Sequence, residues 1–143
     1  MRRKRYILTN RAAGDLREAR AWSRARWGKE LTNRYFDDLD EGAQYIAENH
    51  ASLRGRHDLA GGTALLLHPV REHYLLDEPL DDQIVVIVAV IRQGRDIPAI
   101  LQKWAAPIRR ELTEIRAAIK SGKIHVPTGR RRPSQLRKRA KNT

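Results

Sequence analysis

Cysteine and long hydrophobic runs are both missing from this sequence of 143 residues. Without cysteine, neither a disulfide framework nor a cysteine-ligated metal site can form, and this composition is typical of a protein of the reducing cytoplasm. The longest apolar run, Ile84–Ile91, is far too short to cross a bilayer. The apolar stretch after the first basic residues ends at Thr9, so we expect no secretory signal and no membrane partner.

Acidic residues are missing from both ends of the chain. Residues 2–5 and 129–143 hold eleven of the 29 lysines and arginines, which leaves 18 basic against 17 acidic residues elsewhere. The formal net charge of +12 is therefore a property of the two ends. Such runs are typically disordered and bind nucleic acid without sequence preference, although a solubilising tail explains the second run equally well. Its candidate nucleic-acid-binding residues are Arg130, Arg131, Arg132, Arg137, Lys138 and Arg139.

The first half of the chain predicts two helices joined by one tight break. Thr9 or Asn10 is placed to cap the first helix, which runs to Gly28, a residue that accepts the positive φ of a helix C-terminus. A second helix is predicted over residues 29–49. Its apolar stripe consists of Leu31, Tyr35, Leu39, Ala43 and Ile46.

The second half predicts strands. Leu65–Leu67, Arg71–Asp77 and Ile84–Ile91 are apolar and separated by short turns, so we expect an antiparallel meander. The third of these is almost entirely β-branched and is the best candidate for a central strand covered on both faces. With a short opening strand at Ile7–Leu8, the sequence predicts an α+β domain in which the helical hairpin packs on an antiparallel sheet.

A further helix is predicted after the strands, beginning at Pro107, because a proline is well tolerated in a first helical turn. Its narrow apolar stripe needs a surface to lie on. The default is the chain's own groove, because a tethered helix binds at high effective concentration; a second copy of the chain and a partner protein are the alternatives. The candidate target- or partner-binding residues are Arg92 and Arg95 before this helix and Trp104, Ile108, Leu112, Ile115 and Ile119 within the added segment.

Several chemistries lack the residues they need. The five histidines show no metal-ligand spacing with carboxylates, no glycine-rich loop ends in Gly-Lys-Ser/Thr, and no serine sits in a nucleophile elbow. We therefore expect no metal, no cofactor and no covalent nucleophile. Trp22, Trp27 and Tyr35 recur at helical spacing, and we expect them in the core of the hairpin. Trp104 is expected either to join the added helix to the domain or to face a partner.

A family resemblance emerges from the order and spacing of these segments. The residues that carry it are Tyr6–Leu8, Asp15-Leu16, Trp27-Gly28, Tyr35, Leu39, Glu48-Asn49, the loop Leu53–Leu59, the strand Ile84–Ile91 and Arg92–Ile97. Over residues 6–101 the chain resembles a ParE-type toxin of a bacterial toxin–antitoxin pair. The resemblance implies the β-α-α-β-β-β fold shared by ParE and RelE toxins and an antitoxin that wraps the toxin. It covers a toxin domain (1–101); the apolar spacing and the charge pattern of the remaining residues predict an amphipathic helical extension (102–128) and a basic disordered tail (129–143).

The resemblance leaves the activity open between two classes. ParE-like members poison DNA gyrase by binding it, whereas RelE-like members cut messenger RNA on the ribosome. An RNA-cutting member needs cations for the phosphate and a group that moves the proton. The candidates are Arg71, His73, Arg92 and Arg95, although arginines at strand ends are also common as solvated edge residues.

The positions of the tyrosines favour the first of these classes over the second. RelE-like enzymes tend to place a tyrosine or histidine near the end of the domain, and here that region has no tyrosine and only His125, which lies in the extension. A non-enzymatic gyrase poison is therefore the favoured function. The alternatives are a metal-independent endoribonuclease and a non-toxic module that binds an antitoxin-like partner and nucleic acid.

Overall fold

The computed structural model describes residues 4–53, 60 and 63–122 of the chain. The basic tail over 129–143, its six candidate nucleic-acid-binding residues and His125 lie outside the described residues. Most of the loop predicted after Leu53 also lies outside them.

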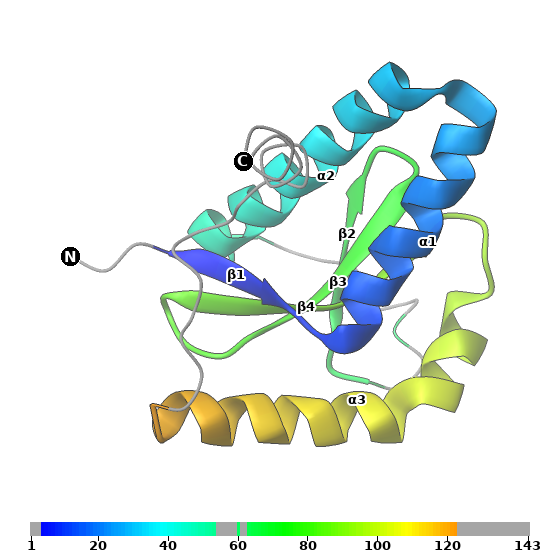
Figure 1. The fold of residues 1–143 in the computed structure, drawn as a ribbon. Coiled ribbons are helices and arrows are strands. Elements are labelled where there is room, and N and C mark those ends of the chain that lie inside the picture. Colours follow the sequence, from blue (N-terminus) through cyan, green and yellow to red (C-terminus); the bar gives the residue numbers. More distant parts are fainter. Residues whose placement is uncertain (1–3, 54–59, 61–62, 123–143) are drawn as a thin grey trace.

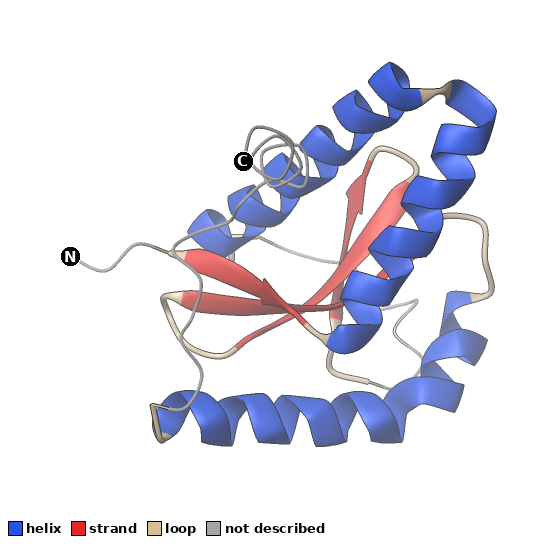
Figure 2. Ribbon diagram, in the orientation of Figure 1, coloured by secondary structure: helices blue, strands red, loops and turns tan. Residues whose placement is uncertain are grey.

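Seven elements make up the described chain (Figures 1 and 2), in the order predicted for an α+β toxin domain with an added C-terminal helix. In sequence order they are β1 (Arg5–Leu8), α1 (Asn10–Trp27), α2 (Lys29–Asn49), β2 (Leu66–Val70), β3 (His73–Pro79), β4 (Ile84–Arg92) and α3 (Ile97–Lys120).

The sheet has the strand order β1-β4-β3-β2. Strands β2, β3 and β4 form the predicted antiparallel meander, and β4 is the central strand, buried along its length as far as Ile91. The expectation of an antiparallel sheet is wrong for β1, which pairs parallel with β4, with Ile7 opposite Val86. Strands running in the same direction need a long crossover, and the two helices of the hairpin lie between β1 and the meander in the chain. The sheet is therefore mixed.

The hairpin between β2 and β3 differs from its prediction. Strand β2 continues through Pro69 to Val70, because an edge strand tolerates a residue that donates no amide hydrogen bond. Arg71, expected inside a strand, instead lies in the two-residue turn and has a φ of 55°. Two-residue hairpin turns usually contain glycine or asparagine, whereas this turn is Arg71-Glu72, so no local signal in the sequence predicts it.

The helical hairpin matches its predicted bounds. The Thr9 hydroxyl accepts a hydrogen bond from the Ala12 amide at 3.0 Å and donates to the Val88 carbonyl at 2.8 Å, so it both caps α1 and joins it to the sheet. Gly28 separates the two helices with a φ of 83°. The predicted α2 stripe faces the sheet apart from Leu31, which is exposed. A Cβ at Gly42 would lie 2.8 Å from Val70, so glycine permits the close approach of α2 to β2.

The added helix α3 starts ten residues earlier than predicted. Asp96 caps it by accepting from the Ala99 amide, and Pro98 rather than Pro107 occupies the first turn. Pro107 lies inside the helix, where it is exposed to solvent. Figure 1 shows the helix changing direction after its first turns, as an internal proline commonly causes. The helix also spans the domain boundary expected at residue 101.

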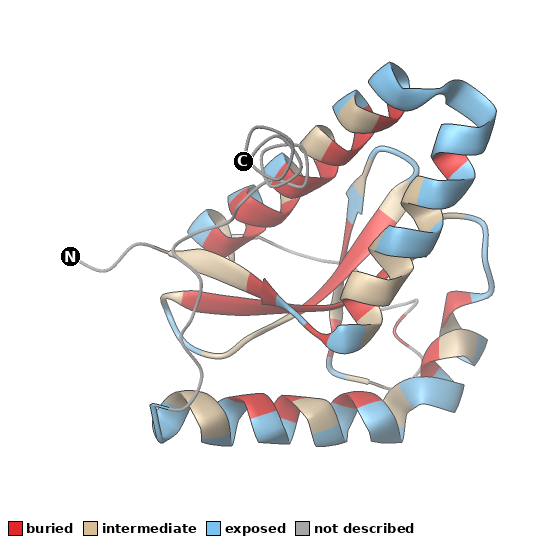
Figure 3. Cartoon of the chain, in the orientation of Figure 1, coloured by how far each residue is buried: buried red, intermediate tan, exposed pale blue. Residues whose placement is uncertain are grey.

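The two faces of the sheet carry two separate layers of core (Figure 3). The hairpin covers one face, where Ala43, Ile46 and Ala47 pack on alternate residues of β4. Helix α3 covers the other face, where Ile108, Leu112 and Ile115 are buried and Ile119 is half-buried. The apolar stripe of α3 therefore packs on the sheet of its own chain, the first of the three surfaces considered for it. None of the helices in the described part of the chain has both the length and the apolar character of a membrane span.

Candidate functional site

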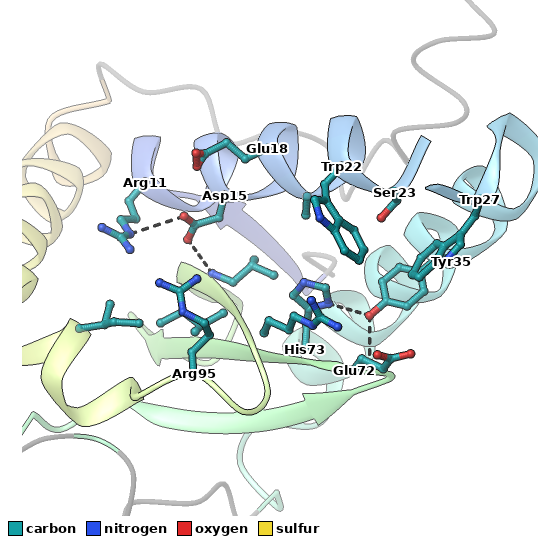
Figure 4. Close-up of a pocket in the computed structure, with 15 residues that line it drawn as sticks. Arg11, Asp15, Glu18, Trp22, Ser23, Trp27, Tyr35, Glu72, His73 and Arg95 are labelled. Carbon is teal, nitrogen blue, oxygen red and sulfur yellow. Dashed lines mark hydrogen bonds and ion pairs between the residues drawn. The ribbon is translucent and has the colours of Figure 1, made fainter. Parts of the chain in front are cut away.

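A cleft of about 290 Å³ opens between α1, the β2–β3 turn and the end of β4 (Figure 4). Its walls come from parts of the chain that are far apart in sequence, brought together because β4 emerges beneath α1 and beside β3. It is lined by Arg11, Asp15, Glu18, Ala19, Trp22, Ser23, Trp27, Tyr35, Glu72, His73, Val90, Ile91, Arg92, Arg95 and Ile100.

A tyrosine–histidine pair lies at one end of the cleft. The Tyr35 hydroxyl lies 2.6 Å from His73 Nδ1 and accepts a hydrogen bond from the Glu72 amide at 3.1 Å. A hydroxyl that accepts from one amide keeps a second lone pair, so it either donates to Nδ1 or accepts from an Nδ1–H, according to the histidine tautomer. In both tautomers Tyr35 engages Nδ1, and the second ring nitrogen, Nε2, takes no part in this contact.

Burial keeps both members of this pair neutral. Burial raises the pKa of Tyr35 above its ordinary value, so the hydroxyl keeps its proton at neutral pH. Burial, with a smaller contribution from the Arg92 guanidinium, lowers the pKa of His73, so the ring is uncharged at the same pH. A neutral imidazole has one lone pair: with the proton on Nε2 the Tyr35 hydroxyl engages it, and with the proton on Nδ1 it lies on Nε2.

Asp15 fastens α1 to the sheet at the other end of the cleft. Its Oδ2 accepts a hydrogen bond from the Val90 amide at 3.0 Å, and Arg11 Nε lies 3.6 Å from its Oδ1. Burial raises the pKa of Asp15, and the Val90 hydrogen bond opposes that rise. The Asp15 carboxylate therefore positions α1 over β4.

The open rim of the cleft combines arginine with tryptophan. Arg92 lies 5.0 Å from the centre of the Trp22 ring, and Arg26 lies over the same ring at 4.6 Å. The indole of Trp27 meets Trp22 edge-on, with 5.6 Å between ring centres. Trp22 and Trp27, expected in the hairpin core, are 42% and 38% exposed, so that expectation is wrong for both. Tyr35 is buried as expected.

The structure brings together three of the four residues predicted for RNA cleavage. His73, Arg92 and Arg95 line the cleft. Arg71 does not line it, because its position in the turn directs it to an ion pair with Asp38 and over the outer side of the Tyr35 ring.

The residues predicted to bind a partner fall into two groups. Arg92 and Arg95 are exposed at the cleft, whereas Ile108, Leu112 and Ile115 pack in the core of the same chain. Trp104 lies 4.5 Å from the Arg11 guanidinium, so it joins α3 to α1 and remains 37% exposed. A second link runs from the Asn10 amide to Glu111 of α3 at 2.7 Å.

Sequence reasoning missed the roles of Tyr35, Asp15 and the two tryptophans in this cleft. Helical periodicity assigned the aromatic residues to the core, since it gives a face and not the width of the face that is covered. One signal was available: Trp22 and Arg26 are four residues apart, the spacing at which two side chains of a helix meet. Among the described residues, no group of three histidine or acidic side chains is placed to hold a metal ion.

The arrangement of a helical hairpin on a sheet ending in an antiparallel meander defines a toxin of the ParE/RelE-like fold. A profile of the ParE toxin of type II toxin–antitoxin systems (parDE) matches residues 6–97, and the chain belongs to this family. Helix α3 lies almost entirely beyond the matched residues. Membership implies an antitoxin partner.

A solved structure supports the same fold. A chain from the chromosomal ParDE toxin–antitoxin system of P. aeruginosa superimposes with a TM-score of 0.52 at 15% identity, covering 62% of this chain and 95% of its own. No curated protein matches the sequence.

Proposed function

We propose that this toxin arrests bacterial growth by binding DNA gyrase, and that its antitoxin neutralises it by covering the toxin. The observation that carries the choice of binding over catalysis is the neutral Tyr35–His73 pair. The Tyr35 hydroxyl contacts Nδ1 at 2.6 Å, so this nitrogen of the histidine is engaged by a neighbour within the chain rather than by a substrate. Gyrase poisoning is the activity that the ParE-like branch of the family implies.

The convergence of His73, Arg92 and Arg95 favours one competing function, a ribosome-dependent messenger-RNA interferase. Two arginines are suited to stabilise a phosphate during cleavage. In this function the imidazole would remove the proton of the ribose hydroxyl, either through Nε2 or after Nδ1 leaves Tyr35. It is the function that the experiment must exclude.

The experiment uses the full chain in three assays. Induction in bacteria should stop growth, and co-expression of the antitoxin encoded beside it should restore growth. Purified toxin should inhibit supercoiling by gyrase or stabilise cleaved DNA, and should leave ribosome-bound messenger RNA intact. Codon-positioned cuts that disappear in an Arg92→Ala variant would establish the interferase instead. Normal growth at confirmed expression would establish the non-toxic module.

The basic tail adds a separate proposal. Seven lysines and arginines among residues 129–143 are able to neutralise several phosphates and release their counterions. We therefore propose weak binding of DNA or RNA without sequence preference, which falls steeply as salt rises. Deleting residues 129–143 should abolish that binding and leave the melting temperature unchanged. A melting temperature lowered by the deletion would show that the tail packs on the domain.

A further inference from the structure

Three arginines at the rim of the cleft differ from the other arginines around it. Arg11 in the cleft wall and Arg71 in the adjoining turn each pair with a carboxylate. Arg26, Arg92 and Arg95 are exposed, and within the described residues none of the three has a carboxylate within ion-pair distance. Their positive charge is therefore available to a ligand.

The Trp22 ring holds two of these guanidinium groups in place. Arg26 and Arg92 lie over it at 4.6 and 5.0 Å from its centre. A guanidinium held beside an aromatic ring still has the N–H groups with which it binds a carboxylate or phosphate through two parallel hydrogen bonds. Stacking also restricts the side chains before a ligand arrives, so less conformational freedom is lost on binding.

The remaining walls favour a peptide over a nucleic acid. Glu18 and Glu72 line the same cleft and repel a continuous chain of phosphates, whereas a peptide offers groups of both signs and backbone amides. Tryptophan, tyrosine and arginine together are the residues most enriched where proteins bind proteins tightly.

We propose that the cleft is the docking site for an acidic segment of the antitoxin. A carboxylate of that segment pairs with Arg92 and Arg95, and a neighbouring apolar side chain packs against the exposed rings of Trp22 and Trp27. The antitoxin is the partner chosen because it is the one that family membership implies. The inference rests on the proposed neutralisation by an antitoxin and adds the surface and the chemistry of the contact.

The test measures the dissociation constant of the full-length toxin and its cognate antitoxin by calorimetry. The double variant Arg92→Gln with Arg95→Gln should weaken binding about tenfold or more, because it removes both partners of a desolvated carboxylate. Its matched control, Arg24→Gln with Arg110→Gln, removes the same charge from exposed positions outside the cleft and should leave affinity nearly unchanged. Trp22→Ala should also weaken binding, while Tyr45→Ala, at an exposed ring on α2, should not.

Two further readouts separate this inference from the proposed function. Circular dichroism and melting curves confirm that each variant is folded, and gyrase inhibition is measured on the same preparations. Loss of antitoxin affinity confirms the docking site whether or not gyrase is inhibited. Equal loss of affinity in the cleft variant and its control would overturn the inference, as would unchanged affinity in both. Unchanged antitoxin affinity with lost binding of a single-stranded oligonucleotide would assign the cleft to nucleic acid.

Discussion

The two faces of the sheet are covered by helices in different ways. The α1–α2 hairpin belongs to the part of the chain that matches the ParE family, and it leaves a charged cleft open where α1 passes over the end of β4. Helix α3 follows the matched residues and closes the opposite face with aliphatic side chains. One layer of the core is therefore supplied mainly by residues beyond the family match, while the cleft and its charged residues lie on the hairpin side.

The two covers also meet. Arg11 pairs with Asp15 inside the cleft and stacks on Trp104 of α3, and Ile100 of α3 forms part of the cleft wall. The added helix therefore supports the site from one side. Because α3 packs on the sheet mainly through its apolar stripe, substitutions there should act on stability first.

The largest expected effect is on the α3 face. Leu112→Asp places a charge in the apolar layer and should lower the free energy of unfolding by about 3 kcal/mol or more, whereas Thr113→Asp, exposed on the same helix, should change it by less than about 0.5 kcal/mol. Urea unfolding of the purified chain measures both. If Leu112→Asp keeps full stability and instead abolishes a dimer on a sizing column, α3 serves self-association and not the chain's own core.

An intermediate effect is expected on the hairpin face at Asp15. Asp15→Ala leaves the Val90 amide without its acceptor and should cost about 1–3 kcal/mol. Asp15→Asn keeps an acceptor oxygen for the Val90 amide and removes the negative charge. Because burial raises the pKa of Asp15, it disfavours that charge, so this substitution should cost less stability than Asp15→Ala. Thermal melts of the two variants compare them directly. Equal loss in both would mean that the ion pair with Arg11, rather than the Val90 hydrogen bond, anchors the helix.

The smallest effect concerns pH. The folded pKa of His73 lies below its unfolded value, so between the two values the unfolded chain binds more protons and acid favours unfolding. The histidine's contribution is therefore intact above about pH 6.5 and is lost as the pH falls through the folded value. Melting temperatures between about pH 7.5 and about pH 5 should fall more steeply for the wild type than for His73→Gln. Parallel slopes would show that the ring stays accessible to protons in the folded chain.

The elements of the hairpin and the central strand were predictable because their signals are local. Helical spacing, the Thr9 cap and the break at Gly28 define α1 and α2, and the β-branched run from Ile84 defines β4. The start of α3 was missed because two prolines compete for the first turn, and the spacing of the later apolar stripe favoured Pro107 over Pro98. The parallel pairing of β1 depends on contacts between residues about 80 positions apart, which no local pattern contains.

The candidate site was predictable only in part for a related reason. Arg92 and Arg95 follow the central strand and were placed correctly at its end. The contact between Tyr35 and His73 joins α2 to β3 across 38 positions, and it depends on how deeply each side chain is buried. The Arg71 turn carries none of the residues that normally mark one, so its departure from the strand was not visible in the sequence.

Growth arrest by a Tyr35→Phe variant tests most directly whether the toxin acts by binding and not by catalysis. The substitution removes one oxygen, keeps the ring, and releases His73 Nδ1 from its contact with the hydroxyl. It should cost only about 1 kcal/mol of stability through the lost hydrogen bond. Action by binding predicts that the folded variant still stops growth and still inhibits gyrase at concentrations close to those of the wild type. Action by binding would be contradicted if the variant stays folded and soluble but no longer stops growth, and if the wild type cleaves messenger RNA while the variant does not.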